Sequence, residues 1–279
     1  MDAVKIIKVI NNNVASAYDE HGKEVVVMGK GIAFQKKKGD PIEQERIEKI
    51  YSLPQESATK FESLVKDIPY EYISTASKII SYAKRTLSKE LNDTIYITLT
   101  DHLNFAVERV KNGMELENAL LWEIKRFYQP EFEVGLKALE VIRDDLGVEL
   151  SEDEAGFFAL HLVNAQVGGD MHKTMNLPGI LKDISNVVHY TFGRIPDDSD
   201  LYYERFVTHL KFFLERSLKG EVYDQGNEEF NTFVKTQYPK SYRCALRIRS
   251  YLKARLQCDV PDEEVTYLTM HIQRITQKQ

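Results

Sequence analysis

The chain has few cysteines and no long apolar run. Of its 279 residues only Cys244 and Cys258 are cysteines, and no C-x-x-C pattern joins them. We therefore predict neither a disulfide framework nor a zinc finger, and the low count suits a reducing cytoplasm. No stretch approaches the roughly 18 apolar residues that a membrane span needs, and Lys5 and Lys8 interrupt the apolar start of the chain. These features predict a cytoplasmic protein with no signal peptide and no membrane insertion.

The short motifs of common enzyme classes are also missing. The sequence has no Walker loop, no dinucleotide-binding fingerprint, no G-x-S-x-G, and neither H-E-x-x-H nor H-x-x-x-H. We predict that the protein is not an enzyme, with no catalytic residues, no metal and no cofactor. A metal-dependent enzyme built on its histidines is kept as an alternative, because neutral imidazole is a common metal ligand.

Negative charge is unevenly distributed along the chain, whose formal net charge is −6. Residues 1–55 hold nine Lys and Arg against eight Asp and Glu, which gives +1. The remainder holds 28 against 35, which gives −7. The negative charge of residues 56–279 would broadly repel a nucleic-acid backbone, so the N-terminal segment is the only part suited to bind one.

The first fifty residues have the pattern of short strands joined by tight turns. Residues rich in β-branched side chains predict strands at 4–10, 14–18, 25–28 and 32–35, with glycine-bearing turns between them. The pattern indicates a small antiparallel meander. Such a sheet buries little apolar surface by itself, so we expect it to pair with a second copy in a homodimer.

Helical periodicity begins after residues 52–58, which have linker composition. Apolar positions then recur on one helical face, as with Ile73, Ala76, Ile80 and Ala83, and later with Phe105 and Val107. A second break at residues 167–170, extending to Leu177-Pro178-Gly179, divides this helical region. The predicted fold class is multidomain: a small antiparallel β-sheet domain (1–55) followed by two all-α helical bundles (60–170 and 171–279).

The two helical parts resemble each other in sequence. Residues 101–109 align with 208–216 at five of nine identical positions, and 146–162 align with 256–272. In the second pair an acidic helix start precedes an apolar helix with one histidine. Ser151 with Glu154 has the spacing of a capping box, and Pro261 suits a first helical position. Four of the seven histidines occupy equivalent positions, two in each repeat: His102, His161, His209 and His271.

Each of these histidines has an ordinary structural interpretation as a buried, hydrogen-bonded imidazole. Retention of all four in two diverged repeats favours a function instead. A near-neutral imidazole is a usable nucleophile, and phosphorylation would place close to two negative charges on it. Arg109 and Arg216 follow His102 and His209 by seven residues on the same helical face, and their guanidinium groups could pair with the negative charge of the phosphate. A solvated Glu-Arg surface is the alternative interpretation of these arginines.

Two N-terminal segments, together with the histidine repeats, resemble a known family. The segments are Lys8-Val-Ile-Asn-Asn-Asn-Val14 and Val26-Val-Met-Gly-Lys-Gly-Ile-Ala-Phe-Gln-Lys36. The whole chain resembles the BglG/SacY/LicT-type transcriptional antiterminators. The resemblance implies a co-antiterminator RNA-binding domain followed by two phosphotransferase-system regulation domains. It further implies that a homodimer binds a hairpin in leader mRNA and prevents a terminator from forming in a sugar-utilisation operon, with β-glucosides as the family-level expectation.

The resemblance also implies an RNA-binding set. Asn11 and Asn13 would offer amides to base edges, Gly29 and Gly31 would let backbone approach RNA, and Phe34 would stack on an unpaired base. The lysines Lys8, Lys30 and Lys36 would meet phosphates, and Gln35 completes the set. Alternative interpretations are a turn-forming Asn run, simple tight turns and a phenylalanine in the sheet core. The family usually has Arg where this chain has Lys30, so the bidentate fork is lost there.

The resemblance assigns phosphoryl donors to the four histidines. His102 and His161 would be phosphorylated by the sugar-specific permease (enzyme II), which silences the protein, and His209 and His271 by the carrier HPr, which favours the active dimer. Asp101 precedes His102, whereas Thr208 takes its place in the second repeat. A DNA-binding transcriptional activator with the same regulation domains is the alternative function, although it would need a helix-turn-helix that the N-terminal strand pattern does not predict.

Overall fold

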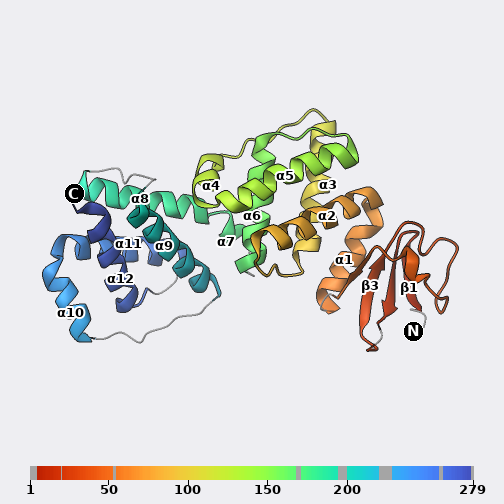
Figure 1. The fold of residues 1–279 in the computed structure, drawn as a ribbon, viewed down its shortest axis with the longest axis horizontal. Coiled ribbons are helices and arrows are strands. Elements are labelled where there is room, and N and C mark those ends of the chain that lie inside the picture. The colour runs from red at the N-terminus through yellow and green to blue at the C-terminus, as the bar shows by residue number, and fades with distance from the viewer. Residues whose placement is uncertain are drawn as a thin grey trace. The chain divides into compact units, whose positions relative to one another are not determined.

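A computed structural model describes residues 5–19, 21–52, 55–167, 171–193, 200–219, 228–257 and 260–277. The chain begins with a small sheet and continues as a series of helices (Figure 1). It forms two compact units. The first contains Met1–Leu121 and Tyr128–Gln166, and the second contains Trp122–Phe127 and Val167–Gln279. This confirms the predicted fold class of a β-sheet domain followed by helical bundles.

The sheet is antiparallel, with strand order β1-β2-β3-β4. Its strands are β1 (Ile6–Asn11), β2 (Val14–Tyr18), β3 (Glu24–Met28) and β4 (Lys49–Tyr51). The strand predicted at 32–35 is wrong. Gly31 has φ +68°, and Gln35 has φ +57°. Ile32 N–H and Phe34 N–H each donate to the carbonyl three residues back, that of Gly29 and of Gly31 respectively. This left-handed turn geometry prevents an extended chain, and β4 supplies the fourth strand instead.

The two faces of the sheet bury different sets of side chains. Alternate residues of a strand point to opposite faces. Val14 and Tyr51 pack with the helices of the first unit, whereas Ala15 and Ala17 pack against Ile32 and its neighbours in the segment that follows β3. A short 3-10 helix, η1 (Gln44–Arg46), lies in the same segment. One face of the sheet is therefore continuous with the helical core.

The first unit contains these helices: α1 (Gln55–Asp67), α2 (Tyr70–Leu87), α3 (Ile95–Lys111), α5 (Gln129–Leu146) and α6 (Glu152–Val167). The predicted apolar face of α2 is confirmed, since Ile73, Ala76, Ile80 and Ala83 are buried. On α3 the prediction is half right. Val107 is buried, but the Phe105 side chain is 61% exposed.

The second unit contains these helices: α4 (Leu121–Phe127), α7 (Met171–Thr174), α8 (Leu177–Phe192), α9 (Leu201–Lys219), α10 (Glu228–Gln237), α11 (Pro239–Leu256) and α12 (Asp262–Thr276). Leu177-Pro178-Gly179, expected in a break, instead begins α8, because proline is tolerated in a first turn. The rest of that break, at residues 168–170, and Cys258 lie outside the described residues.

The sequence repeat is also a structural repeat. Helix α3 corresponds to α9, α5 to α11, and α6 to α12. Even the cap after α5 recurs: Gly147 has φ +67°, and Gln257 after α11 has φ +53°. Among the residues that the structure describes, no helix is both long and apolar enough to cross a bilayer.

Candidate functional site: paired histidines in two helical repeats

The two predicted histidines of the first repeat meet across two helices. His102 lies on α3 and His161 on α6, and their ring centroids are 4.8 Å apart. Helix α3 buries Leu99, Leu103 and Val107 in the core. This packing turns the flank that carries His102 toward α6. The sequence repeat therefore identified residues that the fold brings together.

A buried glutamate links His102 to the predicted arginine. Glu154 Oε2 lies 3.0 Å from His102 Nε2, and Glu154 Oε1 accepts a hydrogen bond from Arg109 Nη2. The Glu154 side chain is only 2% exposed and that of Arg109 only 9%. The proposed Ser151–Glu154 capping box is wrong, because both carboxylate oxygens are engaged by α3. The solvated-surface interpretation of Arg109 is wrong for the same reason.

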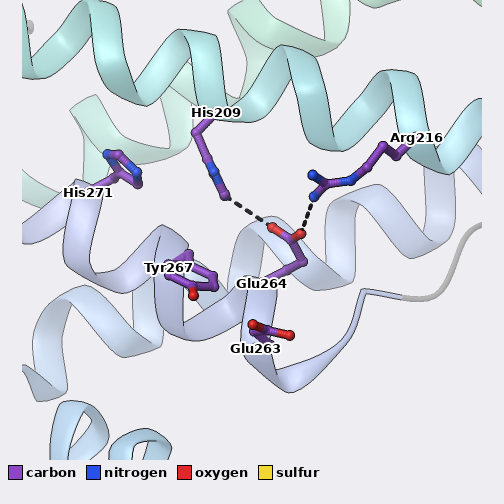
Figure 2. A pocket seen from close by; sticks show the side chains of 6 residues that line it. All are labelled: His209, Arg216, Glu263, Glu264, Tyr267 and His271. Atoms are coloured by element: carbon purple, nitrogen blue, oxygen red, sulfur yellow. Dashed lines mark hydrogen bonds and ion pairs between the residues drawn. The ribbon is translucent and has the colours of Figure 1, made fainter. Parts of the chain in front are cut away.

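The second repeat contains the same arrangement (Figure 2). Glu264 on α12 lies between His209 and Arg216 of α9, with its Oε2 3.0 Å from His209 Nε2 and its Oε1 2.5 Å from Arg216 Nη2. The imidazoles of His209 and His271 are stacked, with centroids 5.0 Å apart. The contact between His209 Nε2 and Glu264 Oε2 has the distance of an ion pair but lacks hydrogen-bond alignment. Neither of these two atoms has a hydrogen-bond partner among the described residues.

The second arrangement is more open to solvent than the first. It lines a pocket of about 440 Å³ together with Glu263 and Tyr267. The Arg216 side chain is 37% exposed, against 9% for Arg109. An incoming molecule therefore has room to approach the histidines of the second repeat.

Burial keeps the second histidine of each pair neutral. It lowers the pKa of His161 to about 3, with a smaller contribution from the neighbouring His102. It also lowers the pKa of His271 to about 4, assisted by His209 and by the arginines Arg274 and Arg205. Neutral imidazole retains a lone pair on one ring nitrogen. Both rings are therefore nucleophiles rather than cations at neutral pH.

The carboxylates are the functional residues that the sequence argument missed. Glu154 and Glu264 precede the second histidine of their repeats by the same seven residues, and this equivalence was the available signal. Asp101, predicted as a supporting residue, is exposed and contributes no contact to this cluster among the described residues. Each repeat therefore presents two adjacent imidazoles, one carboxylate and one guanidinium, a set suited to accepting and holding an anionic group.

The predicted RNA-binding residues divide into two groups. The first surrounds the turn after β3. Asn13 Oδ1 accepts a hydrogen bond from Gly31 N–H at 2.7 Å and so fixes this turn. Lys30 and Gln35 are exposed, and Phe34 is 56% exposed, which makes the sheet-core interpretation of Phe34 wrong. The turn presents an aromatic face and a cation to solvent.

The second group is engaged by the protein itself. Lys8 Nζ donates to Glu62 Oε2 at 2.6 Å, and Asn11 Nδ2 donates to the Val65 carbonyl at 2.7 Å, both on α1. Lys36 Nζ likewise donates to the Pro41 carbonyl.

Gly29 packs closely against the chain itself. A Cβ placed on it would lie 1.9 Å from the Arg46 carbonyl oxygen. The two glycines therefore differ, because Gly31 needs its left-handed φ and has open space around it.

The helix-turn-helix of the alternative DNA-binding function is not found in residues 5–19 and 21–52. These described residues contain the four antiparallel strands β1 to β4 and, as their only helix, the short η1. The recognition helix that such a motif inserts into a major groove therefore has no candidate there.

Comparisons with known proteins cover the whole chain. A model of the CAT RNA binding domain matches residues 4–60, and a model of the PRD domain matches residues 77–165 and 179–275. The transcription antiterminator LicT of Bacillus subtilis (strain 168) is 44% identical over 99% of this chain and 100% of its own length. The beta-glucoside operon antiterminator of Dickeya chrysanthemi is 41% identical over 98% and 96%. The crystal structure of GlcT CAT-PRDI superimposes with a TM-score of 0.53 and 31% identity, covering 59% of this chain and 99% of that one.

Proposed function

The chain belongs to the family of transcription antiterminators with a CAT RNA binding domain and two PRD domains, and on that basis we propose that it controls a sugar-utilisation operon through its leader transcript. As a homodimer it binds a hairpin in the leader mRNA and prevents the terminator from forming. Histidine phosphorylation by the phosphotransferase system sets this activity. The similarity to a beta-glucoside operon antiterminator makes β-glucosides the proposed sugar class.

One observation carries the proposal: a histidine pair with a carboxylate and an arginine occurs in each of two PRD domains that follow an RNA-binding sheet. A structural histidine needs one hydrogen-bond partner, not the same four-residue set twice. Phosphorylation exchanges a neutral ring for a dianionic group, and Arg109 and Arg216 lie within reach of that charge.

The proposed domains are residues 1–55 for RNA binding and 60–170 and 171–279 for regulation. The permease (enzyme II) is the proposed donor to His102 and His161, with loss of activity, and HPr is the donor to His209 and His271, with gain of activity. The open pocket at the second pair supports access by a carrier protein. A protein that acts on a nascent transcript works in the cytoplasm, which is its proposed location.

The proposed RNA contacts centre on the turn after β3. Phe34 stacks on an unpaired base, while Asn13 and Gly31 shape the turn and Lys30 meets phosphate. Lys8 and Asn11 are secondary candidates, because an RNA contact by either would compete with its bond to α1.

RNA binding is tested by a gel shift with a hairpin of roughly thirty nucleotides from the gene's own leader, compared at one salt concentration with duplex DNA of the same sequence. The proposal expects the hairpin to be bound at least tenfold more tightly, roughly the discrimination of one good specific contact. Preference for the duplex would overturn it.

Regulation is tested by incubating the full chain with phosphoenolpyruvate, enzyme I and HPr. We expect acid-labile phosphate on the second PRD domain, and its loss in the His209→Ala, His271→Ala double variant. The His102→Ala, His161→Ala double variant is the matched control and retains the HPr-dependent label. Unchanged labelling of the first variant would overturn the donor assignment.

A further inference from the structure

The two ring nitrogens of His102 and His209 have different surroundings. In each repeat the Nε2 atom faces a carboxylate: His102 Nε2 is 3.0 Å from Glu154 Oε2, and His209 Nε2 is 3.0 Å from Glu264 Oε2. The first contact is a hydrogen bond, whereas the second has ion-pair distance only, since the buried His209 Nε2 and Glu264 Oε2 have no hydrogen-bond partner among the described residues. Figure 2 shows the His209 imidazole directed at the Glu264 carboxylate. In each of these two histidines, Nε2 faces a carboxylate and Nδ1 does not, so the two ring nitrogens differ in their chemistry.

An ionised carboxylate can only accept hydrogen bonds, so the ring nitrogen facing it carries the proton. The Arg109 and Arg216 guanidinium groups hold both carboxylates in place, because each binds the other carboxylate oxygen. Neutral imidazole has one protonated nitrogen, and with the proton on Nε2 the lone pair is on Nδ1. The carboxylate thus fixes the tautomer, as a third group does for a catalytic histidine.

We propose that Glu154 and Glu264 are positioning residues that make Nδ1 the phosphoryl-accepting nitrogen of His102 and His209. This proposal rests on the proposed function, since it specifies the atom at which that regulation occurs. It assigns to the two glutamates a role in the transfer itself, in addition to their packing.

The transfer balances with a phosphohistidine protein as donor. The Nδ1 lone pair forms the new N–P bond as the donor's N–P bond breaks, and the donor ring leaves with that electron pair as neutral imidazole. Each ring keeps the proton on the nitrogen that is not bonded to phosphorus. Positive charge therefore moves from the donor ring to the acceptor ring. Glu154 or Glu264 stabilises that charge through Nε2–H.

The second histidine of the first pair has the opposite arrangement. His161 Nδ1 is buried and has no hydrogen-bond partner within the described ranges. A phosphoryl group cannot reach an enclosed nitrogen, so His161 accepts through Nε2. The two neighbouring rings of the first pair thus use different nitrogens.

The tautomer is tested first, without any phosphoryl donor. The full chain labelled with ¹⁵N-histidine is examined by NMR above pH 7, with assignment by single His→Gln variants. We expect Nε2-protonated tautomers for His102 and His209, and a shift toward a tautomer mixture for His209 in Glu264→Gln. The Glu263→Gln variant is the matched control, because this neighbour lines the same pocket. A predominant Nδ1-protonated form in the unmodified chain would overturn the proposal.

The accepting nitrogen is tested second. The chain is phosphorylated by HPr, or chemically with phosphoramidate, and the peptide carrying His209 is isolated in alkali and analysed by ³¹P NMR. We expect the Nδ1 isomer. In Glu264→Gln we expect a roughly tenfold slower transfer from HPr, because the neutral amide stabilises the positive charge that develops on the His209 ring less well than the carboxylate does. The Nε2 isomer, or equal rates for Glu264→Gln and Glu263→Gln, would overturn it. Failure of HPr alone, with the Nδ1 isomer formed from phosphoramidate, would instead count against the proposed donor.

Discussion

Removing the glutamate of each cluster should destabilise the two repeats unequally. Glu154→Ala leaves Arg109, whose side chain is 9% exposed, buried without its counter-ion. Removal of one partner from a buried ion pair typically costs about 3–5 kcal/mol. Glu264→Ala leaves Arg216, which is 37% exposed and can be hydrated, so we expect a cost of about 1 kcal/mol. The same substitution thus differs by about 2 kcal/mol or more between the repeats.

Hydrogen exchange of the full chain measures this difference locally, because amides of each helix report the opening free energy of their own region. We expect strong loss of protection in α3 and α6 for Glu154→Ala, and weak loss in α9 and α12 for Glu264→Ala. Glu154→Gln is the control, since its amide oxygen still accepts one hydrogen bond. Equal losses in the two repeats, or a larger loss in the second, would refute the reasoning from burial.

Three further predictions concern the RNA-binding turn, a helix cap and the buried imidazoles. Phe34→Ala should weaken hairpin binding by about 1–3 kcal/mol, the usual contribution of stacking on one base. The melting temperature should not change, because the Phe34 side chain is 56% exposed, and a parallel loss of stability would contradict this. Gln257→Gly should stabilise the second unit by about 0.5–1 kcal/mol in urea unfolding, because Gln257 has φ +53°, and Gly147→Ala at the equivalent cap should destabilise. The pKa of His161 is lowered to about 3, so the folded state disfavours protonation of this ring. The neutral His161 therefore contributes to the free energy of unfolding above about pH 6.5, and this contribution is lost as the pH falls toward 3. His161→Gln should therefore flatten the decline of unfolding free energy between pH 6.5 and 4, and an unchanged slope would show that another group is responsible.

The histidine pairs could be predicted from the sequence because they are repeated. Duplication places His102 with His161, and His209 with His271, at equivalent points of equivalent helices, and helix packing then brings each pair together. The glutamates were not predicted, because Glu154 stands three residues after Ser151 and has the spacing of a helix cap. Its actual partners are 45 and 52 residues away, so local spacing could not identify them.

Contacts that local sequence does not report also separate the structure from the sequence-based expectations. Lys8 and Asn11 were assigned to RNA from their place in the motif, but each bonds to a residue of α1 that is 54 positions away. The residues after Gly31 have strand-like composition, yet the left-handed glycine directs them into turns. Phe105 was assigned to the apolar face of α3 with Val107, but residues two apart point to nearly opposite sides of a helix. Phe105 is exposed, and the Arg109 guanidinium lies 5.1 Å from its ring centre. Periodicity alone does not report such a contact.

The central claim is that phosphorylation of the paired histidines decides how well the N-terminal sheets bind the transcript. The most direct measurement is the dissociation constant of the full-length protein for its leader hairpin, by fluorescence anisotropy at fixed salt, before and after phosphorylation by HPr. We expect tighter binding after phosphorylation, and no change in the His209→Ala, His271→Ala variant. Equal dissociation constants for the phosphorylated and unphosphorylated protein would contradict the claim.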